Sequence, residues 1–216
     1  MRTFTNYQKF LKEIEKVKEL DYKPSLLLHA CCTPCSCYPL LLLKDYFDIT
    51  VFYNNSNIYP LNEFELRYET LKSYIDDINS EYNANIKLIK TGYENSKFNK
   101  ILEPRKDDKE GNVRCFMCYS LRYKELVEYA SNNNFEYVCS VMTISRQKNE
   151  EMINKILEGY ASKYNNIKYL YSNFKKDQGL EKAQQIIKKD KFYSQNYCGC
   201  KFSLRGDAQY ETVFKE

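Results

Sequence analysis

The sequence has a single histidine, His29, and no run of about 18 consecutive apolar residues. One imidazole disfavours copper sites and histidine-rich non-haem iron sites, because those sites need several such ligands. Without a long apolar run no segment is predicted to span a membrane, so we expect no membrane partner. Residues 1–21 are charged and polar and have no apolar stretch typical of signal peptides, which favours a cytoplasmic location.

Cysteine, by contrast, is abundant. The 216 residues include nine cysteines, and a hydrophobic content of 43% gives enough apolar material for a core without disulfide staples. A reducing cytosol disfavours structural disulfides, so these thiols indicate metal binding or redox chemistry. The formal net charge of +4 permits a nucleic-acid partner without requiring one.

Short strand-like runs alternate with helical patterns along the chain. Leu61–Ser80 is the clearest helix, because its apolar residues recur every three or four positions and Pro60 precedes it. The predicted strands are 25–30, 49–53, 86–90, 137–142 and 167–171, and the other predicted helices lie within 1–23 and over 40–46, 118–132, 149–164 and 179–189. This alternation predicts an α/β fold, a Rossmann-like parallel sheet with helices on both faces.

We expect one domain over residues 1–216. Residues 25–175 would form the α/β core, and residues 176–204 would form a cysteine-bearing C-terminal part, in which a helix and a CGC segment close the metal site. Ligands of open parallel sheets bind at the carboxyl ends of the strands, so residues that follow strands are the first candidates for a site.

Three groups of cysteines carry the chemistry. They are Cys31-Cys32-Thr33-Pro34-Cys35-Ser36-Cys37 directly after the first strand, Cys115-Phe116-Met117-Cys118 before a helix, and Cys198-Gly199-Cys200 near the end. A CxxC pair is a natural chelate that zinc sites and iron–sulfur sites both use. An adjacent pair is awkward for a structural zinc knuckle, because successive side chains diverge, and suits a larger cluster or two neighbouring centres.

The residues leave the role of the last pair open. Gly199 frees the backbone, so Cys198 and Cys200 can form a strained, reducible disulfide. Alternatively, the two thiolates complete a second metal site together with Cys35. His29 precedes the first group and is a candidate to orient a ligand or donate a proton, or else a core histidine.

Five segments in this order resemble the QueH family of epoxyqueuosine reductases. They are HACCTPCS, NIYPLNEFELRYETL, GNVRCFMCYSLR, SRQKNEE and YSQNYCGCKFS, and they extend from about Ser25 to Leu204. The resemblance implies a Rossmann-like fold of HUP type that carries a [4Fe–4S] cluster. It also implies the last step of queuosine synthesis, in which the epoxide of a modified wobble base is reduced. The partners would be the tRNA anticodon loop and an external electron donor.

The resemblance assigns roles to individual cysteines. The cluster-ligand positions would be Cys31, Cys32, Cys115 and Cys118, and the redox-active pair would be Cys198 and Cys200. An adjacent mononuclear iron would be a second cofactor beside the cluster, and it would recruit Cys31, Cys35 or the C-terminal pair instead.

Reducing an epoxide needs two electrons, protons and a Lewis acid for the oxygen. A cluster passes one electron at a time, so a neighbouring dithiol or second iron would complete the two-electron capacity. His29, Tyr59 or a bound water would deliver the proton. The candidates for contacts with tRNA phosphates are Arg114, Arg122, Arg146 and Lys148.

Two other functions remain as alternatives. A zinc-stabilised RNA-binding protein would explain the CxxC pair and the basic charge, but it leaves the CC and CGC pairs unexplained. A tRNA-thiolating ATP pyrophosphatase needs a Gly- and Ser-rich loop after the first strand to hold pyrophosphate. Here residues 31–37 read CCTPCSC, without glycine.

Overall fold

The computed structural model describes residues 4–204 and has a five-stranded parallel sheet at its centre. The strands are β1 (Ser25–His29), β2 (Asp48–Tyr53), β3 (Lys87–Lys90), β4 (Tyr137–Ser140) and β5 (Lys168–Tyr169). Their order across the sheet is β3-β2-β1-β4-β5, and each neighbouring pair is parallel. The central strand β1 pairs Leu28 with Val51 on one side and with Cys139 on the other. The α/β prediction is confirmed.

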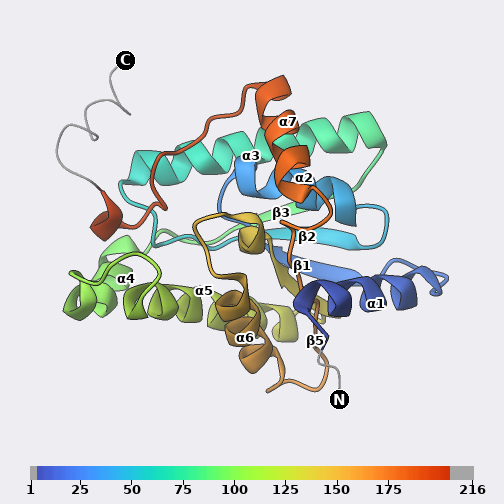
Figure 1. Cartoon of the computed structure of the whole chain (residues 1–216), viewed down its shortest axis with the longest axis horizontal. Coiled ribbons are helices and arrows are strands. Elements are labelled where there is room, and N and C mark those ends of the chain that lie inside the picture. Colours follow the sequence, from blue (N-terminus) through green and yellow to red (C-terminus); the bar gives the residue numbers. More distant parts are fainter. Residues whose placement is uncertain (1–3, 205–216) are drawn as a thin grey trace.

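Helices cover both faces of this sheet (Figure 1). They are α1 (Asn6–Lys18), α2 (Thr33–Leu43), α3 (Leu61–Tyr82), α4 (Asn95–Leu102), α5 (Val113–Asn132), α6 (Glu150–Ala161) and α7 (Gly179–Asp190). Leu26 and Leu28 pack with α1, α2, α3 and α7, whereas Leu27 packs with α5 and α6. Successive residues of a strand point to opposite faces, so β1 is apolar on both sides.

Two helices begin earlier than the sequence predicts, and both contain cysteines. Helix α2 begins at Thr33 rather than at residue 40, because Pro34 in its first turn is compatible with a helix start. Helix α5 begins at Val113 rather than at residue 118, so the CxxC pair lies in its first turns. Helix α4 was not predicted, and β4 ends two residues early in a short 3₁₀ helix, Val141–Ile144.

The helix predicted to start after Pro60 does so, and α3 begins at Leu61. Within residues 4–204 no helix combines the length and apolar character needed to cross a bilayer.

Candidate metal and redox site

The cysteines gather where β1 and β4 end, at the centre of the sheet. Strand β1 continues to β2 on one side, and β4 continues to β5 on the other side. The connections therefore leave the carboxyl ends of these two neighbouring strands in opposite directions. Such a reversal opens the crevice in which doubly wound sheets bind their ligands.

Three sulfurs form a compact group at this place, which we call the triad. The Sγ atoms of Cys31, Cys32 and Cys35 all lie within 4.8 Å of one another. The sulfurs of the adjacent Cys31 and Cys32 are 3.8 Å apart, so these side chains do not diverge as expected from the sequence. The extended backbone of Cys32, with φ −173°, precedes α2 as its N-cap residue, and the first helical turn then returns Cys35 to the same point.

The electrostatics of the triad separate one thiolate from two thiols. Hydrogen bonds from Cys32 and then Cys35 hold the pKa of Cys31 well below its usual range. The same pairing with Cys31 raises the pKa of Cys32 to about 11 and that of Cys35 well above its ordinary value. The positive end of α2 also favours negative charge here. Cys31 is therefore the sulfur most readily deprotonated, whereas Cys32 and Cys35 would release their protons when a thiophilic metal ion binds.

The second group joins α5 to the C-terminal segment. Burial raises the pKa of Cys118 to about 11, and the charges that act on Cys118 and on Cys115 include Cys198. The amide of Gly111 donates to Cys115 Sγ at 3.2 Å. Cys198 therefore raises the pKa of both thiols of the CxxC pair, although it lies on the C-terminal segment.

Cys198 is the thiolate of this second group. The thiol of Cys200 donates to it and, despite burial, holds its pKa well below the usual range, with help from Ser203, whose Oγ lies 3.1 Å from Cys198 Sγ. The amide of Cys200 also donates to Cys198 Sγ at 3.4 Å. No disulfide joins Cys198 to Cys200 in this structure.

Lys148 lies between the two groups. It lines a cavity of about 320 Å³ together with Cys35, Gln195 and Cys198. Burial alone would lower its pKa, but the sulfurs of both groups, Cys31 first, raise it above the ordinary value. Lys148 thus supplies a shared positive charge to two thiolates that come from opposite ends of the chain.

The structure therefore divides the cysteines of the three segments into two groups rather than into the sets assigned from the sequence, and one cysteine of each group, Cys35 and Cys198, lines the shared cavity. Cys31 and Cys32 lie with Cys35, which had been assigned to a possible second metal. Neither Cys115 nor Cys118 joins the triad at its 4.8 Å spacing. The assignment of individual ligands stays a prediction.

His29 is fully buried behind the triad. Its Nδ1 lies 3.0 Å from Ser140 Oγ, and its ring packs edge-on against Tyr123 with centroids 5.4 Å apart. Burial and then the charge of Arg122 lower its pKa to about 3, so the imidazole is neutral near pH 7. A neutral ring in the core matches the alternative of a core histidine better than that of a charged proton donor.

The basic residues predicted to contact tRNA divide into two pairs. Arg114 and Arg122 are each only 3% exposed, so the prediction that they contact phosphates is wrong. The guanidinium of Arg114 donates to backbone carbonyls, among them that of Asp108 at 2.6 Å, and Arg122 donates to Asn55 Oδ1 at 3.1 Å. Arg146 is exposed and Lys148 is half-buried. Lys148 lines the cavity, and Arg146 stands in sequence between two residues that line it, Ser145 and Gln147.

Sequence reasoning missed several polar residues that serve the cysteines. Gln195 Nε2 donates to Cys32 Sγ at 3.0 Å and so links the C-terminal segment to the triad. Glu63 and Arg67 form a buried ion pair on α3. The signal for this pair was present, because a Glu and an Arg four residues apart fall on the apolar face of the predicted helix.

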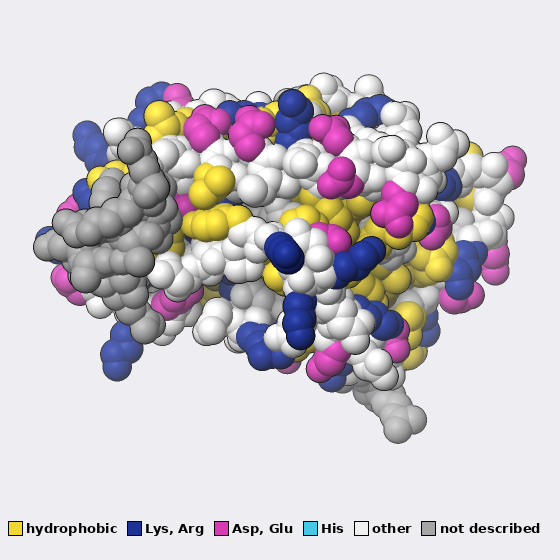
Figure 2. All heavy atoms as spheres, turned by 90° about the horizontal axis from the view of Figure 1, so that it is seen from above, with side chains coloured by type: hydrophobic (Ala, Val, Ile, Leu, Met, Phe, Trp, Pro, Cys, Tyr) yellow, Lys and Arg dark blue, Asp and Glu magenta, His cyan; other side chains and the backbone are white. Residues whose placement is uncertain are grey.

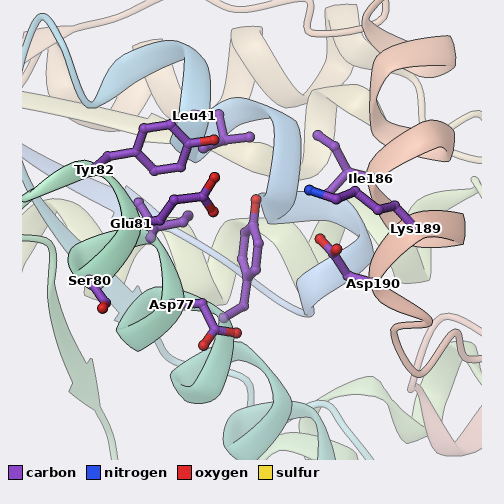
Figure 3. A pocket seen from close by; sticks show the side chains of 10 residues that line it. Leu41, Asp77, Ser80, Glu81, Tyr82, Ile186, Lys189 and Asp190 are labelled. Carbon is purple, nitrogen blue, oxygen red and sulfur yellow. The ribbon is translucent and has the colours of Figure 1, made fainter.

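A second hollow, of about 470 Å³, lies between α2, α3 and α7 and has different chemistry. Figure 3 shows Asp77 and Glu81 of α3 facing Lys189 and Asp190 of α7 across it. Its lining contains no sulfur, so it offers nothing for redox chemistry. On the face seen in Figure 2, basic and acidic side chains are interspersed.

The donor set of the crevice fits a thiophilic metal centre. The triad consists of sulfur alone, two of its three residues are buried, and three sulfurs that share one point are what zinc and iron–sulfur sites use. The triad could therefore hold a metal.

Comparison with known proteins agrees with this geometry. Residues 26–206 match the family model described as "Epoxyqueuosine reductase QueH". The chain belongs to the QueH family. It is 36% identical to the QueH of Staphylococcus aureus over 215 residues, which cover 98% of this chain and 89% of that protein. It is 35% identical to the QueH of Acinetobacter baylyi, covering 88% and 85%, and 29% identical to that of Thermotoga maritima, covering 83% and 90%. The family resemblance inferred from the sequence is confirmed. The matched region contains all three cysteine groups found in the sequence.

Proposed function

We propose that this chain reduces the epoxide of epoxyqueuosine in tRNA and thereby produces queuosine. The observation that carries the proposal is the cavity that Cys35 of the triad and Cys198 of the C-terminal pair line together, within the region that matches QueH. In this reaction the epoxide oxygen leaves as water, two electrons and two protons are consumed, and the two ring carbons become joined by a double bond. The electrons come from an external donor.

The proposed cofactor is a [4Fe–4S] cluster. When bound, an iron–sulfur centre with an open coordination position supplies single electrons and a Lewis acid for the oxygen. Cys31 is a ligand candidate in each arrangement considered, and Cys32 is one for the cluster. The remaining ligands come either from Cys115 and Cys118 or, for an adjacent mononuclear iron, from Cys35 and the C-terminal pair.

The chain's own residues would prepare the crevice for the substrate. A cavity of about 320 Å³ lies at the lower end of the volumes of small-molecule sites, about 300–1,000 Å³, and suits one extruded base better than a whole anticodon loop. Gln147, Gln195 and Asn196 in its lining offer amide groups to the base. The exposed Arg146 would bind a phosphate.

Cys198 and Lys148 would act next to the bound base. The Cys198 thiolate and the Cys200 thiol form a dithiol that can yield two electrons and one proton on closing to a disulfide. Lys148 would stabilise negative charge in the cavity. Residues 176–204 would close the site over the triad, as the sequence predicts for the C-terminal part of the chain.

The test is a turnover assay with tRNA that carries epoxyqueuosine. Protein purified without oxygen is supplied with a low-potential reductant, and the nucleosides are analysed by mass spectrometry. Conversion to queuosine by the wild type, and none by Cys32→Ala, supports the proposal. An iron-replete wild-type protein that leaves the epoxide intact contradicts it.

A second pair of variants decides between the ligand sets. If Cys118→Ala loses iron and Cys35→Ala keeps it, the CxxC pair binds the cluster. The reverse result assigns the metal to the triad. Zinc in place of iron, in protein that was never exposed to air, would favour the zinc-stabilised RNA-binding alternative.

A further inference from the structure

A buried ion pair on α3 lies beneath the C-terminal cysteines. Glu63 and Arg67 are one helical turn apart, with Arg67 Nε 2.6 Å from Glu63 Oε1, and their side chains are 0% and 1% exposed. Taking two charges out of water is costly unless their remaining hydrogen-bonding groups also find partners. The hydrogen-bond partners of those remaining groups therefore indicate the role of the ion pair.

The remaining groups reach the segment that carries Cys198. Arg67 donates through NH1 to the carbonyl of Cys198 at 3.2 Å and through NH2 to that of Tyr197 at 3.4 Å. The second carboxylate oxygen of Glu63 accepts a hydrogen bond from the hydroxyl of Tyr193 at 2.7 Å. One ion pair thus holds three points of a segment that lies about 130 residues further along the chain.

This segment has few other ties. Between the end of α7 at Asp190 and the short 3₁₀ helix Lys201–Ser203 it has no regular structure of its own. The amide of Tyr59 donates to the carbonyl of Gly199 at 2.8 Å, and Ile58 forms an isolated bridge with Cys200. The hydroxyl of Tyr197 also donates to the carbonyl of Tyr59, and Gln195 Nε2 donates to Cys32 Sγ. The place of the two thiols therefore depends on a small number of contacts, and Arg67, whose side chain is 1% exposed, makes two of them.

The fit between Arg67 and the CGC turn is also steric. Gly199 has φ +103°, and a Cβ at this position would lie 3.0 Å from Arg67 NH1 and 2.9 Å from Ile58 Cγ1. The guanidinium fills the space beneath the glycine while its two NH groups donate to the preceding carbonyls. A lysine would supply the charge but not this planar fork.

We propose that Glu63, Arg67 and Tyr193 form a positioning device for the CGC turn, which holds the Cys198 and Cys200 thiols against the crevice. Arg67 and Glu63 are buried, so they act through the turn and not by touching tRNA. The catalytic consequence rests on the proposed reductase function, whereas the mechanical consequence, a fixed CGC turn, does not.

Hydrogen exchange of the complete chain, analysed by mass spectrometry, tests the mechanical part. In Arg67→Lys, amides of residues 193–200 should exchange at least about ten-fold faster, while those of β4 keep the wild-type rate. Tyr193→Phe, which removes one hydrogen bond, should give a smaller increase in the same residues. Tyr22→Phe removes a Tyr–Glu hydrogen bond elsewhere, to Glu136, and should leave residues 193–200 unchanged.

The two contrary results are equally clear. Unchanged exchange of residues 193–200 in Arg67→Lys would overturn the proposal. Equal acceleration in β4 in both Arg67→Lys and Tyr193→Phe would also overturn it, because the pair would then support the whole fold.

Kinetics then test the catalytic part. Because the device does not touch tRNA, Tyr193→Phe and Arg67→Lys should lower kcat, the latter by about ten-fold or more, with KM for the tRNA within about two-fold. A raised KM with unchanged kcat would contradict positioning of the thiols. If the wild type lacks reductase activity while exchange responds as expected, the proposed function fails and the positioning device stands.

Discussion

The triad and the CGC turn contribute sulfurs to one crevice but are built in different ways. Cys31 and Cys32 lie in the three-residue link between β1 and α2, and Cys35 lies in the first turn of α2, so a central strand and a helix hold all three from both sides. The CGC turn lies in an irregular segment whose position depends on side chains of α3, on two backbone contacts with residues 58 and 59, and on the hydrogen bond from Gln195 to Cys32.

Electrostatically the two groups are alike. Each has one sulfur whose pKa is lowered, Cys31 or Cys198, because a neighbouring thiol donates to it. Lys148 acts on both. The comparison indicates that the triad is a rigid binding site, as expected for groups carried by regular elements, whereas the CGC turn can be displaced without loss of the triad.

The largest effect should come from removing a sulfur of the triad. Cys32→Ala removes a central sulfur of the triad, so we expect iron and turnover to be lost together. Cys139→Ala is the matched control, because that thiol is also buried but lies within β4, and it should keep both. Metal analysis and the tRNA assay measure the outcome. Full iron content in Cys32→Ala would remove this residue from the ligand set.

The next largest effect should come from removing a thiol of the CGC turn. Cys198→Ala should lose turnover but keep most of its iron, because the triad does not depend on the turn. The same two measurements apply. If this variant lost its iron as completely as Cys32→Ala, Cys198 would be a metal ligand and the proposed division of labour would be wrong.

A substitution within the turn should sharpen the comparison without removing a thiol. Gly199→Ala places a Cβ against Ile58 and Arg67 at a positive φ, so we expect turnover to fall by about ten-fold or more with iron retained. Gly159→Ala in α6 meets nothing within 4 Å and should leave turnover unchanged. Equal activity of the two variants would show that the turn is not held as described.

The smallest effect concerns the shared charge. The pKa of Cys198 is lowered, so its thiolate persists to a lower pH than that of an ordinary thiol, and loss of a nearby cation must raise this pKa. Lys148→Met should therefore shift the alkylation of Cys198 in reduced, metal-free protein to higher pH. Arg146→Met, an exposed cation nearby in sequence, should leave the midpoint unchanged. An unshifted midpoint in Lys148→Met would exclude Lys148 as the shared counter-charge.

Much of the fold could be predicted from the sequence, because its signals are local. The apolar run of β1 and the periodic face of α3 behind Pro60 are specified by neighbouring residues, and the alternation of elements then predicts the parallel sheet. The early start of α2 was missed because CCTPCSC has the composition of a loop. Its helical form depends on packing against α3 and α7, which no local pattern encodes.

The site could be predicted as a set of cysteines but not as two groups. Sequence spacing alone does not show that Cys35, rather than Cys115 or Cys118, joins Cys31 in the triad. This depends on where α2 begins. Arg114 and Arg122 were assigned to the surface because charged residues are seldom buried. Their burial depends on carbonyl and amide partners that the tertiary fold supplies.

The most direct test of the account is the iron and acid-labile sulfide content of wild-type protein purified and kept without oxygen. The account predicts about four iron and four sulfide per chain, with additional iron if a mononuclear centre is present. Zinc without sulfide in such a preparation would contradict it.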